Sequence, residues 1–512
     1  MQAIFDHGPL APCPAPFNLA AYVLARAGTL GLSPALAVIS PDGAETWSYA
    51  RLEAAVLGAA RGLQAEGLQA GDRLLMRLGN SVDFPICYLA ALAADLVPVP
   101  TSSLLTAPEV TQIAEDVAPS LIVAEDGLAL PAGAPCPVLS VERLRAMYAL
   151  APATYVMGDP DRPGYIIYTS GTSGQPRAVT HAHRAIWARQ MMWDYWYGLT
   201  EADRLLHAGA FNWTYTLGTG LLDPWTRGAT ALIPAAGVTP DELPHLLQQH
   251  KATIFAAAPG VYRQLLRTPP PPLPDLRHGL SAGEKLPDAT RAAWEAATAT
   301  PVFEAFGMSE CSTFVSGSPA HPAPFGTLGY PQEGRRVAVL NEDGPVGIGE
   351  PGVLSIASRD PGLMLGYWNA PQETAQRFQG EWFLTGDLVS MGTDGALTYL
   401  GRADDMMNAG GIRVSPLEVE DALNAHPAIL ESAATEVTVK ADTTVIAAFY
   451  VANDTVTPDE LDGFVSGRLA RYKVPRIYGQ VDALPKGPNG KLLRRRLRQQ
   501  HEDTLPGSPH QK

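Results

Sequence analysis

Residues 164–185 read GYIIYTSGTSGQPRAVTHAHRA and carry the strongest local signal in the chain. The apolar run from Tyr165 to Tyr168 predicts a buried strand, which leads into a loop rich in glycine and hydroxyl groups. Glycine admits backbone angles that other residues avoid, so several N–H groups can converge on one anion. The loop therefore predicts a site for the β- and γ-phosphates of ATP, formed by Thr169, Ser170, Gly171, Thr172, Ser173, Gly174 and Arg177.

This loop is not a Walker A loop, because that pattern needs a Gly-Lys-Ser/Thr run and residue 176 is proline. A flexible Ser/Gly linker is the alternative, but linkers rarely lie between a buried strand and a helical segment. We expect a helix after the loop. His181 and His183 form an HxH pair, and we expect them to cap or line that helix rather than to bind a metal ion.

The pattern of apolar residues divides the chain into three regions. Helical and strand patterns alternate over much of the first 400 residues, which predicts mainly parallel sheets covered by helices. From about Gly326 to Leu400, short runs separated by DG turns predict an antiparallel, β-rich subdomain. Ser415-Pro416 and Thr457-Pro458 then predict helix starts in a small domain. The expected fold class is α/β, with a large domain over 1–402 and a small α+β domain over 403–512.

Composition narrows the possible functions. The 512 residues carry a formal net charge of −15, so no broad basic face for nucleic acid is expected. The four cysteines include no CxxC pair, which argues against a disulfide framework or a zinc site. Neither a signal peptide nor a stretch long enough to span a bilayer is recognised, so a cytoplasmic protein is expected.

A second glycine pattern is a decoy. Residues 347–352 read GIGEPG, which matches the dinucleotide-binding pattern GxGxxG. Pro351 would break the helix that this pattern requires, and Glu350 would repel a pyrophosphate. We expect a turn in the antiparallel region.

Four further motifs follow the loop in a fixed order: FEAFGMSE (303–310), EWFLTGDLV (381–389), YLGRADDMMNAGGIRVSPLEVE (399–420) and LPKGPNGKLLRRRLR (484–498). With the loop, they resemble the ANL superfamily, which comprises acyl- and aryl-CoA synthetases, peptide-synthetase adenylation domains and luciferases. Two positions depart from that pattern. Arg177 stands where the family usually has lysine, and Phe306 replaces a frequent tyrosine.

The resemblance implies a site for Mg·ATP. Glu310 would bind Mg²⁺, for which a carboxylate is a natural hard ligand. The backbone around Phe306 and Gly307 would pack on adenine, and Ser309 would lie near the phosphates. Asp387 would accept hydrogen bonds from the ribose hydroxyls, and Arg402 would contact ribose or phosphate.

The C-terminal motifs imply a mobile small domain that serves two half-reactions. Lys491 would stabilise the transition state in which an acid attacks the α-phosphorus of ATP. The small domain would then turn about Asp404. This turn would present Gly410 and Gly411, beside which the pantetheine arm of CoA would lie.

Within the superfamily, the chain is most similar to benzoate–CoA ligases and related synthetases. The resemblance implies a small carboxylic acid and CoA as partners, in a monomer or homodimer. The threonines of the expected acyl pocket favour a substituted benzoate, another small ring acid or a short polar acid. That pocket would be formed by Trp213, Thr214, Tyr215, Thr216, Ser281, Ala282, Gly283 and Thr313.

Two alternatives remain open at this point. One is a stand-alone adenylation enzyme that loads a carrier protein, although no carrier domain is recognised in the sequence. The other is a non-catalytic nucleotide-binding relative, which the departure at Arg177 would favour. Glu310, Asp387, Arg402 and Lys491 argue against this second alternative.

Overall fold

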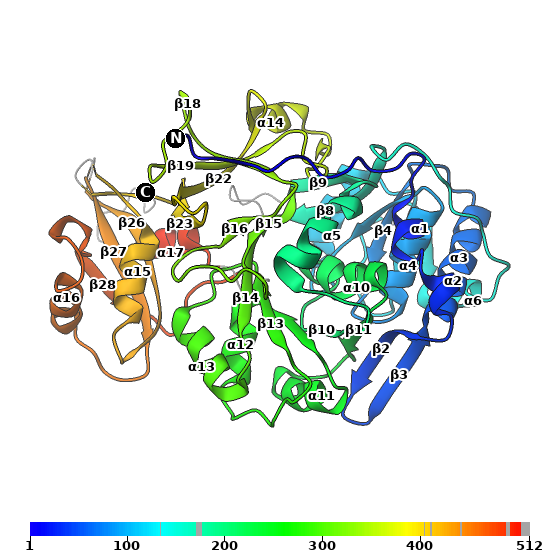
Figure 1. The fold of residues 1–512 in the computed structure, drawn as a ribbon, viewed down its shortest axis with the longest axis horizontal. Coiled ribbons are helices and arrows are strands. Elements are labelled where there is room, and N and C mark those ends of the chain that lie inside the picture. Colours follow the sequence, from blue (N-terminus) through cyan, green and yellow to red (C-terminus); the bar gives the residue numbers. More distant parts are fainter. Residues whose placement is uncertain are drawn as a thin grey trace. The chain divides into compact units, whose positions relative to one another are not determined.

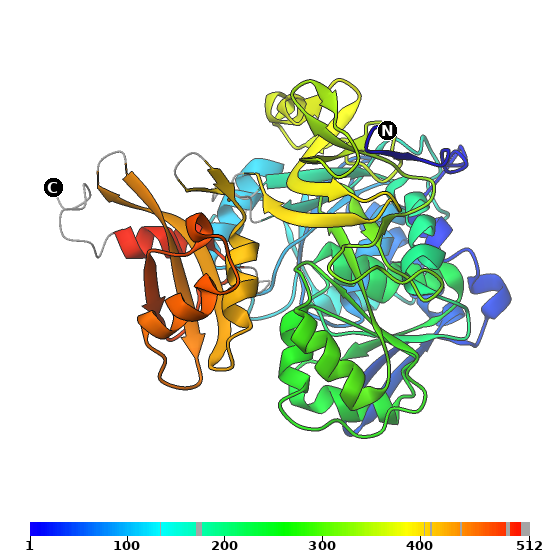
Figure 2. The ribbon, with the colours of Figure 1, turned by 60° about the vertical axis from the view of Figure 1, so that its left-hand side comes forward.

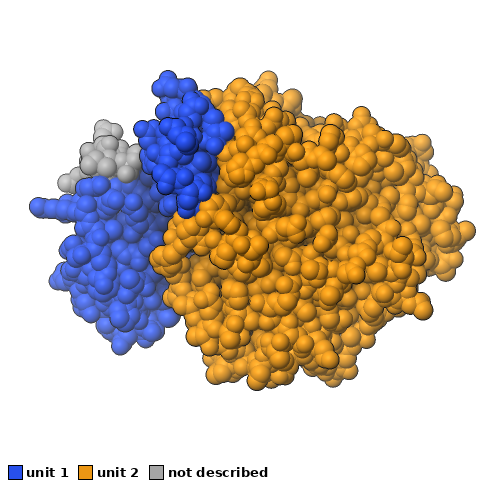
Figure 3. Space-filling view, in the orientation of Figure 1, with its two compact units in different colours: residues 1–4, 338–355, 384–512 blue, residues 5–337, 356–383 orange. Residues whose placement is uncertain are grey.

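The structure is a computed structural model that describes residues 1–133, 135–169, 177–403, 405–409, 412–440, 443–487 and 492–502. Its chain forms two compact units (Figures 1 and 3). Unit 1 comprises residues 1–4, 338–355 and 384–512, and unit 2 comprises residues 5–337 and 356–383. The domain boundary expected between residues 402 and 403 stays a prediction.

Unit 2 contains a nine-stranded sheet with the order β16-β15-β14-β13-β12-β10-β11-β2-β3. The pairs from β14 through to β2 are parallel, and the outer pairs are antiparallel. This confirms the expected parallel core. Its strands are β2 (Pro34–Ser40), β3 (Gly43–Ser48), β10 (Arg204–His207), β11 (Thr230–Pro234), β12 (Ile254–Ala257), β13 (His278–Ala282), β14 (Val302–Met308), β15 (Ser312–Ser316) and β16 (Tyr330–Pro331).

A second sheet of unit 2 is entirely parallel, in the order β5-β4-β6-β7. Its strands are β4 (Arg73–Arg77), β5 (Val97–Pro100), β6 (Leu121–Ala124) and β7 (Val138–Ser140). Helix α3 (Tyr49–Ala65) begins at Ser48, whose side chain accepts a hydrogen bond from Arg51 N, and the helix buries one apolar face. It packs against α4 (Asp83–Ala93) and α6 (Val141–Met147).

A third sheet, β20-β9-β8, corrects one expectation. The segment after the glycine-rich loop is not a helix but strand β9 (Arg177–Ala182), which pairs antiparallel with β8 (Pro163–Thr169). Residues 178–182 are buried, and Val179 and Thr180 are β-branched, which suits a strand better than a helix. Strand β20 (Gly366–Tyr367) pairs with the other edge of β9.

Unit 2 contains several further helices. Residues 240–249 form a 3₁₀ turn (Pro240–Glu242) followed by α11 (Leu243–Gln249). The others are α1 (Leu19–Val23), α2 (Ala27–Leu30), α5 (Ala107–Val117), α7 (Ala185–Ala188), α8 (Gln190–Met192), α9 (Thr214–Leu217), α10 (Asp223–Arg227), α12 (Pro259–Leu265), α13 (Asp288–Thr298) and α14 (Pro371–Gln376), with π-helical turns at Trp193–Tyr197 and Gly218–Leu222.

A seven-stranded sheet follows the order β1-β17-β19-β22-β21, with β18 beside β17 and β23 beside β22. Its strands are β1 (Ile4–Asp6), β17 (Arg336–Asn341), β18 (Gly344–Pro345), β19 (Pro351–Ala357), β21 (Phe378–Gln379), β22 (Trp382–Met391) and β23 (Leu397–Arg402). The GIGEPG decoy is a turn that runs into β19, as expected. Gly347 N donates a hydrogen bond to Glu350 Oε2 at 2.8 Å, which closes this turn.

The C-terminal part of unit 1 is a small α+β fold, orange to red in Figure 2. Helix α15 (Pro416–Asn424) begins at Ser415, and α16 (Pro458–Ser466) begins at Thr457, as predicted. The sheet β26-β27-β28 has one antiparallel and one parallel pair. Its strands are β26 (Ile429–Lys440), β27 (Thr443–Ala452) and β28 (Ile477–Gln480); a short ribbon joins β24 (Met407–Ala409) to β25 (Ile412–Val414), and α17 spans Arg494–Glu502.

Among the helices described, none combines the length and the apolar composition that crossing a membrane requires.

Candidate active site

The predicted metal ligand Glu310 lies on a tight turn between β14 and β15. The Glu310 carboxylate accepts a hydrogen bond from the Tyr367 hydroxyl at 2.7 Å, and its backbone carbonyl accepts one from Met364 N at 2.7 Å. Ser312, which ends the turn, has a φ of 65°, a backbone conformation that serine rarely adopts. The turn therefore depends on contacts with residues outside it.

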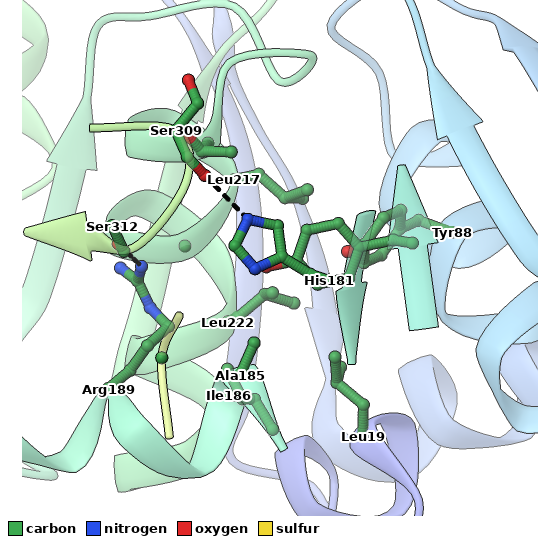
Figure 4. A pocket seen from close by; sticks show the side chains of 14 residues that line it. Leu19, Tyr88, His181, Ala185, Ile186, Arg189, Leu217, Leu222, Ser309 and Ser312 are labelled. Carbon is green, nitrogen blue, oxygen red and sulfur yellow. Dashed lines mark hydrogen bonds between the residues drawn. The ribbon is translucent and has the colours of Figure 1, made fainter. Parts of the chain in front are cut away.

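His181 supplies one of these contacts (Figure 4). Its Nε2 lies 2.7 Å from the Ser309 carbonyl oxygen, which can only accept, so Nε2 carries the proton. Burial lowers the pKa of His181 to about 4, so the ring is neutral near pH 7. His181 therefore acts as a buried donor to the Glu310 turn. The sequence predicted that His181 caps or lines a helix and did not predict its contact with Ser309.

Two buried ion pairs support the same turn. The Arg189 guanidinium pairs with Asp223 at 2.6 Å and donates to Ser312 Oγ at 2.6 Å. Arg335 pairs with Asp360 at 2.6 Å and donates to the Thr313 carbonyl at 3.0 Å. Buried charges persist when they are paired and hydrogen-bonded, as here. Neither pair was singled out from the sequence.

Phe306 and Gly307 lie on β14 immediately before the turn. The Phe306 ring packs edge-on against Phe314, with centroids 5.6 Å apart. A β-bulge falls between Phe306 and Gly307, and a Cβ at Gly307 would lie 2.3 Å from the Ser312 carbonyl oxygen. Only glycine therefore fits where the two strands approach.

Of the predicted phosphate loop, the structure describes the first and the last residue, Thr169 and Arg177. Thr169 and Arg177 are opposite each other in the β8/β9 pair. The Arg177 guanidinium forms an ion pair with Glu373 at 3.0 Å and lies over the Tyr367 ring, 5.3 Å from its centroid. An open cavity of about 300 Å³ lies beside these residues and is lined by Tyr168, Arg177, Tyr367, Trp368 and others.

The residues of the expected acyl pocket are brought together only in part. The Trp213 ring lies over Gly283, where a Cβ would be 2.8 Å from it, and Trp213 packs edge-on against Tyr215. Ala282 belongs to the same buried cluster as Tyr215. Side chains alternate along β13, so the Ser281 side chain points to the face opposite Tyr215. On the Tyr215 side, Ser281 can contribute only backbone atoms to the pocket.

The threonines predicted for the pocket differ in their surroundings. Thr214 lines a small cavity of about 20 Å³. Figure 4 shows His181 and Ser309 in the wall of the same cavity. Thr216 is fully buried, and Thr313 Oγ1 donates to Met192 Sδ at 3.1 Å. A cavity of this size has room for about one water molecule.

One further residue beside the pocket was missed by sequence reasoning. The His207 ring packs edge-on against Tyr215, with centroids 4.3 Å apart. Gly209 N donates to His207 Nδ1 at 3.0 Å, and burial lowers the pKa of His207 to about 3. His207 is therefore a neutral part of the aromatic cluster.

In unit 1, the predicted ribose ligand Asp387 lies on β22, opposite Arg402 on β23. The Tyr399 hydroxyl donates to Asp387 Oδ1 at 2.9 Å, and Arg402 donates to Oδ2 at 3.2 Å. Burial, followed by the neighbouring Asp387 charge, raises the pKa of Tyr399, which keeps its hydroxyl protonated. Tyr399 is the first residue of the motif at residues 399–420, but the sequence did not predict that it contacts Asp387.

Five predicted groups lie outside the described residues: Ser170 to Gly174, Asp404, Gly410, Gly411 and Lys491. Their roles stay predictions.

Two family models match the chain. The model described as AMP-binding enzyme matches residues 31–368, and the model of the AMP-binding enzyme C-terminal domain matches residues 418–491. A benzoate–CoA ligase of Thauera aromatica is 32% identical over 490 residues, which cover 89% of this chain and 91% of that protein. A 3-hydroxybenzoate–CoA ligase of Aromatoleum sp. (strain CIB) is 29% identical, with 92% and 94% covered.

Solved structures also resemble this chain over most of its length. A benzoate CoA ligase from Burkholderia xenovorans LB400 superposes with a TM-score of 0.85 at 30% identity, covering 94% of this chain and all of that one. ATP-bound MatB from Rhodopseudomonas palustris superposes with a TM-score of 0.86 at 27% identity, covering 96% and 100%. The likeness therefore extends over nearly the whole chain.

Proposed function

This chain belongs to the AMP-binding enzyme family, and on that premise we propose that it is an ATP-dependent carboxylic acid–CoA ligase for a benzoate-like acid. The observation that carries the proposal is the match to a benzoate–CoA ligase over 89% of the chain, in which Glu310 and Asp387 are held by hydrogen bonds. The four cysteines are free thiols, which supports a reducing compartment such as the cytoplasm.

The first half-reaction joins the acid to AMP. A carboxylate oxygen of the acid attacks the α-phosphorus of ATP, and the bond from that phosphorus to the bridging oxygen of pyrophosphate breaks. The products are acyl-AMP and pyrophosphate. The protein needs no covalent nucleophile, because orientation of the reactants and stabilisation of the developing charge lower the barrier. In the proposal, Lys491 supplies that charge and Asp387 orients the ribose.

The residues around Glu310 fit a Mg²⁺ ion. Mg²⁺ in phosphate-transfer sites is bound by one or two carboxylates together with phosphate oxygens and water, rather than by a cage of protein ligands. Glu310 offers one carboxylate on a turn braced by buried contacts, and the described residues contain no cluster of three or more His, Cys, Asp or Glu side chains suited to a metal. When bound, the ion would neutralise phosphate charge and polarise the phosphorus–oxygen bonds.

The second half-reaction transfers the acyl group to CoA. The thiol of CoA loses its proton and attacks the acyl carbon, the bond to the AMP oxygen breaks, and AMP leaves. In the proposal, Asp404 is the pivot of the small domain, and Gly410 and Gly411 leave room for the pantetheine arm.

The aromatic cluster supports a ring-bearing acid. Trp213 and Tyr215 meet edge-on with centroids 5.2 Å apart, and Tyr215 stacks on Trp196 at 5.7 Å. Such a wall favours a flat apolar group. The threonines at 214 and 313 support a polar substituent on the ring, in line with the hydroxybenzoate–CoA ligases among the relatives.

Neither alternative is favoured by the relatives. The two alternative functions are a carrier-loading adenylation enzyme and a non-catalytic nucleotide-binding protein. The benzoate– and hydroxybenzoate–CoA ligases that resemble this chain match it over 91% to 94% of their own length.

The proposal is tested by measuring pyrophosphate release with benzoate, the three hydroxybenzoates, anthranilate and short aliphatic acids, with and without CoA. We expect turnover with one or more ring acids, with acyl-CoA formed in equal amount only when CoA is present. Release that stays independent of every acid would refute the ligase.

Replacing Asp387 with asparagine is expected to raise the KM for ATP by about 10- to 100-fold, because hydrogen bonds to a charged group contribute about 1.5–3 kcal/mol. The measurement compares ATP with 2′,3′-dideoxy-ATP in both proteins. The wild type should prefer ATP, and the variant should lose most of that preference. An unchanged preference would show that Asp387 does not bind the ribose hydroxyls.

A further inference from the structure

Residues 364–368 connect the predicted metal ligand to the strand that follows the phosphate loop. Met364 N donates to the Glu310 carbonyl at 2.7 Å. Leu365 N donates to the Thr180 carbonyl, and Trp368 N donates to the Ala178 carbonyl, both at 2.8 Å on β9. Backbone hydrogen bonds therefore fix the segment on both sides. From this segment, the side chain of Tyr367 donates a hydrogen bond to the Glu310 carboxylate.

We propose that Tyr367 is a positioning residue of the ligase reaction, which sets the direction of the Glu310 carboxylate toward the metal of Mg·ATP. This inference rests on the proposed function. The hydrogen bond of 2.7 Å joins the Tyr367 hydroxyl to Glu310 Oε1, and the two residues are 57 positions apart in the chain. A carboxylate that binds a metal is commonly oriented by such a hydrogen-bond donor behind it.

The Tyr367 hydroxyl is a neutral donor. Tyr367 is buried at 5% exposure, and its hydroxyl donates to Glu310 Oε1 at 2.7 Å. A phenol has an ordinary pKa of about 10, so near neutral pH it donates its proton in a hydrogen bond and carries no charge. Because the donor is neutral, it orients Glu310 without cancelling the negative charge that attracts Mg²⁺.

Arg177 explains how the ring itself is held. Its guanidinium lies over the Tyr367 ring, 5.3 Å from the centroid, and its ion pair with Glu373 fixes it there at 3.0 Å. A planar guanidinium stacks on an aromatic ring better than an ammonium group does. The arginine that departs from the family's usual lysine therefore braces the positioning tyrosine from the side of the phosphate loop.

Tyr367→Phe tests the inference because it removes the hydroxyl and keeps the ring under Arg177. ATP binding is measured by calorimetry in excess Mg²⁺ and again in EDTA, with no acid present. We expect the affinity in Mg²⁺ to fall by about 10-fold, as for other residues that orient metal ligands, and the affinity in EDTA to change by less than about 2-fold. An equal loss in both conditions, or no loss in Mg²⁺, would overturn it.

Tyr155→Phe is the matched control. The Tyr155 hydroxyl donates to Oε1 of Glu53, a residue of α3 outside the predicted site, at 3.0 Å. The substitution therefore removes a similar tyrosine–glutamate hydrogen bond at a distant place. We expect ATP affinity in Mg²⁺ to stay within about 2-fold of the wild type. A loss equal to that of Tyr367→Phe would mean that the effect is not specific to Glu310.

A double-mutant cycle separates this inference from the proposed function. In a Glu310→Gln background, Tyr367→Phe should change the affinity in Mg²⁺ by less than about 2-fold further, since the carboxylate to be oriented is gone. An additive loss would contradict the positioning role. The binding measurements need no acid or CoA, so a protein that activates no acid in the panel could still confirm Tyr367, and an active ligase could still refute it.

Discussion

Lys491→Ala is expected to lower acid-dependent pyrophosphate release by about 10²- to 10³-fold, the loss typical of removing one group that stabilises developing charge. The role of Lys491 comes from its place in the last of the motifs, after a glycine-rich turn. Its ammonium group would stabilise the negative charge that builds on the α-phosphate as the acid attacks. The loss should therefore appear in the rate rather than in the KM for ATP.

Two measurements make this prediction specific. Supplied with the acyl-AMP of its own acid, the variant should transfer the acyl group to CoA within about 3-fold of the wild-type rate, since the lysine acts in the first step alone. Lys486→Ala is the matched control, because Lys486 lies in the same motif but forms an ion pair with Glu431. Equal losses in both half-reactions would contradict the assigned role.

Asp360→Ala is expected to destabilise unit 2 by about 3–5 kcal/mol, because it leaves the Arg335 guanidinium buried without its counter-ion. Both side chains are buried, at 0% and 1% exposure, and the ion pair measures 2.6 Å. Arg335 also donates to the Thr313 carbonyl next to the Glu310 turn. The variant should therefore lose stability and, at permissive temperature, bind Mg·ATP more weakly.

Urea unfolding followed by tryptophan fluorescence measures this loss in the right unit, because all nine tryptophans lie in unit 2. Glu201→Ala is the control, since it breaks the ion pair with Arg26, in which the side chains are 37% and 62% exposed. Exposed pairs contribute about 0–1 kcal/mol. A midpoint for Asp360→Ala that matches the control would show that Arg335 finds another partner.

Patterns that are local in the chain were predictable from the sequence. Ser415 and Thr457 each marked a helix start, and the structure begins α15 and α16 there. The ordered motifs were enough to recognise the superfamily, which the match to the AMP-binding enzyme family confirms. These features depend on neighbours within a few residues, so no knowledge of distant pairing was needed.

The tertiary structure alone decided which distant residues meet. Tyr367 reaches Glu310 because β20 pairs with β9, and Ser281 faces away from Tyr215 because side chains alternate along β13. The strand after the glycine-rich loop, expected to be a helix, is stabilised by its partners on both edges. Strand pairing and side-chain direction arise from contacts between segments far apart in the chain, which no local pattern encodes.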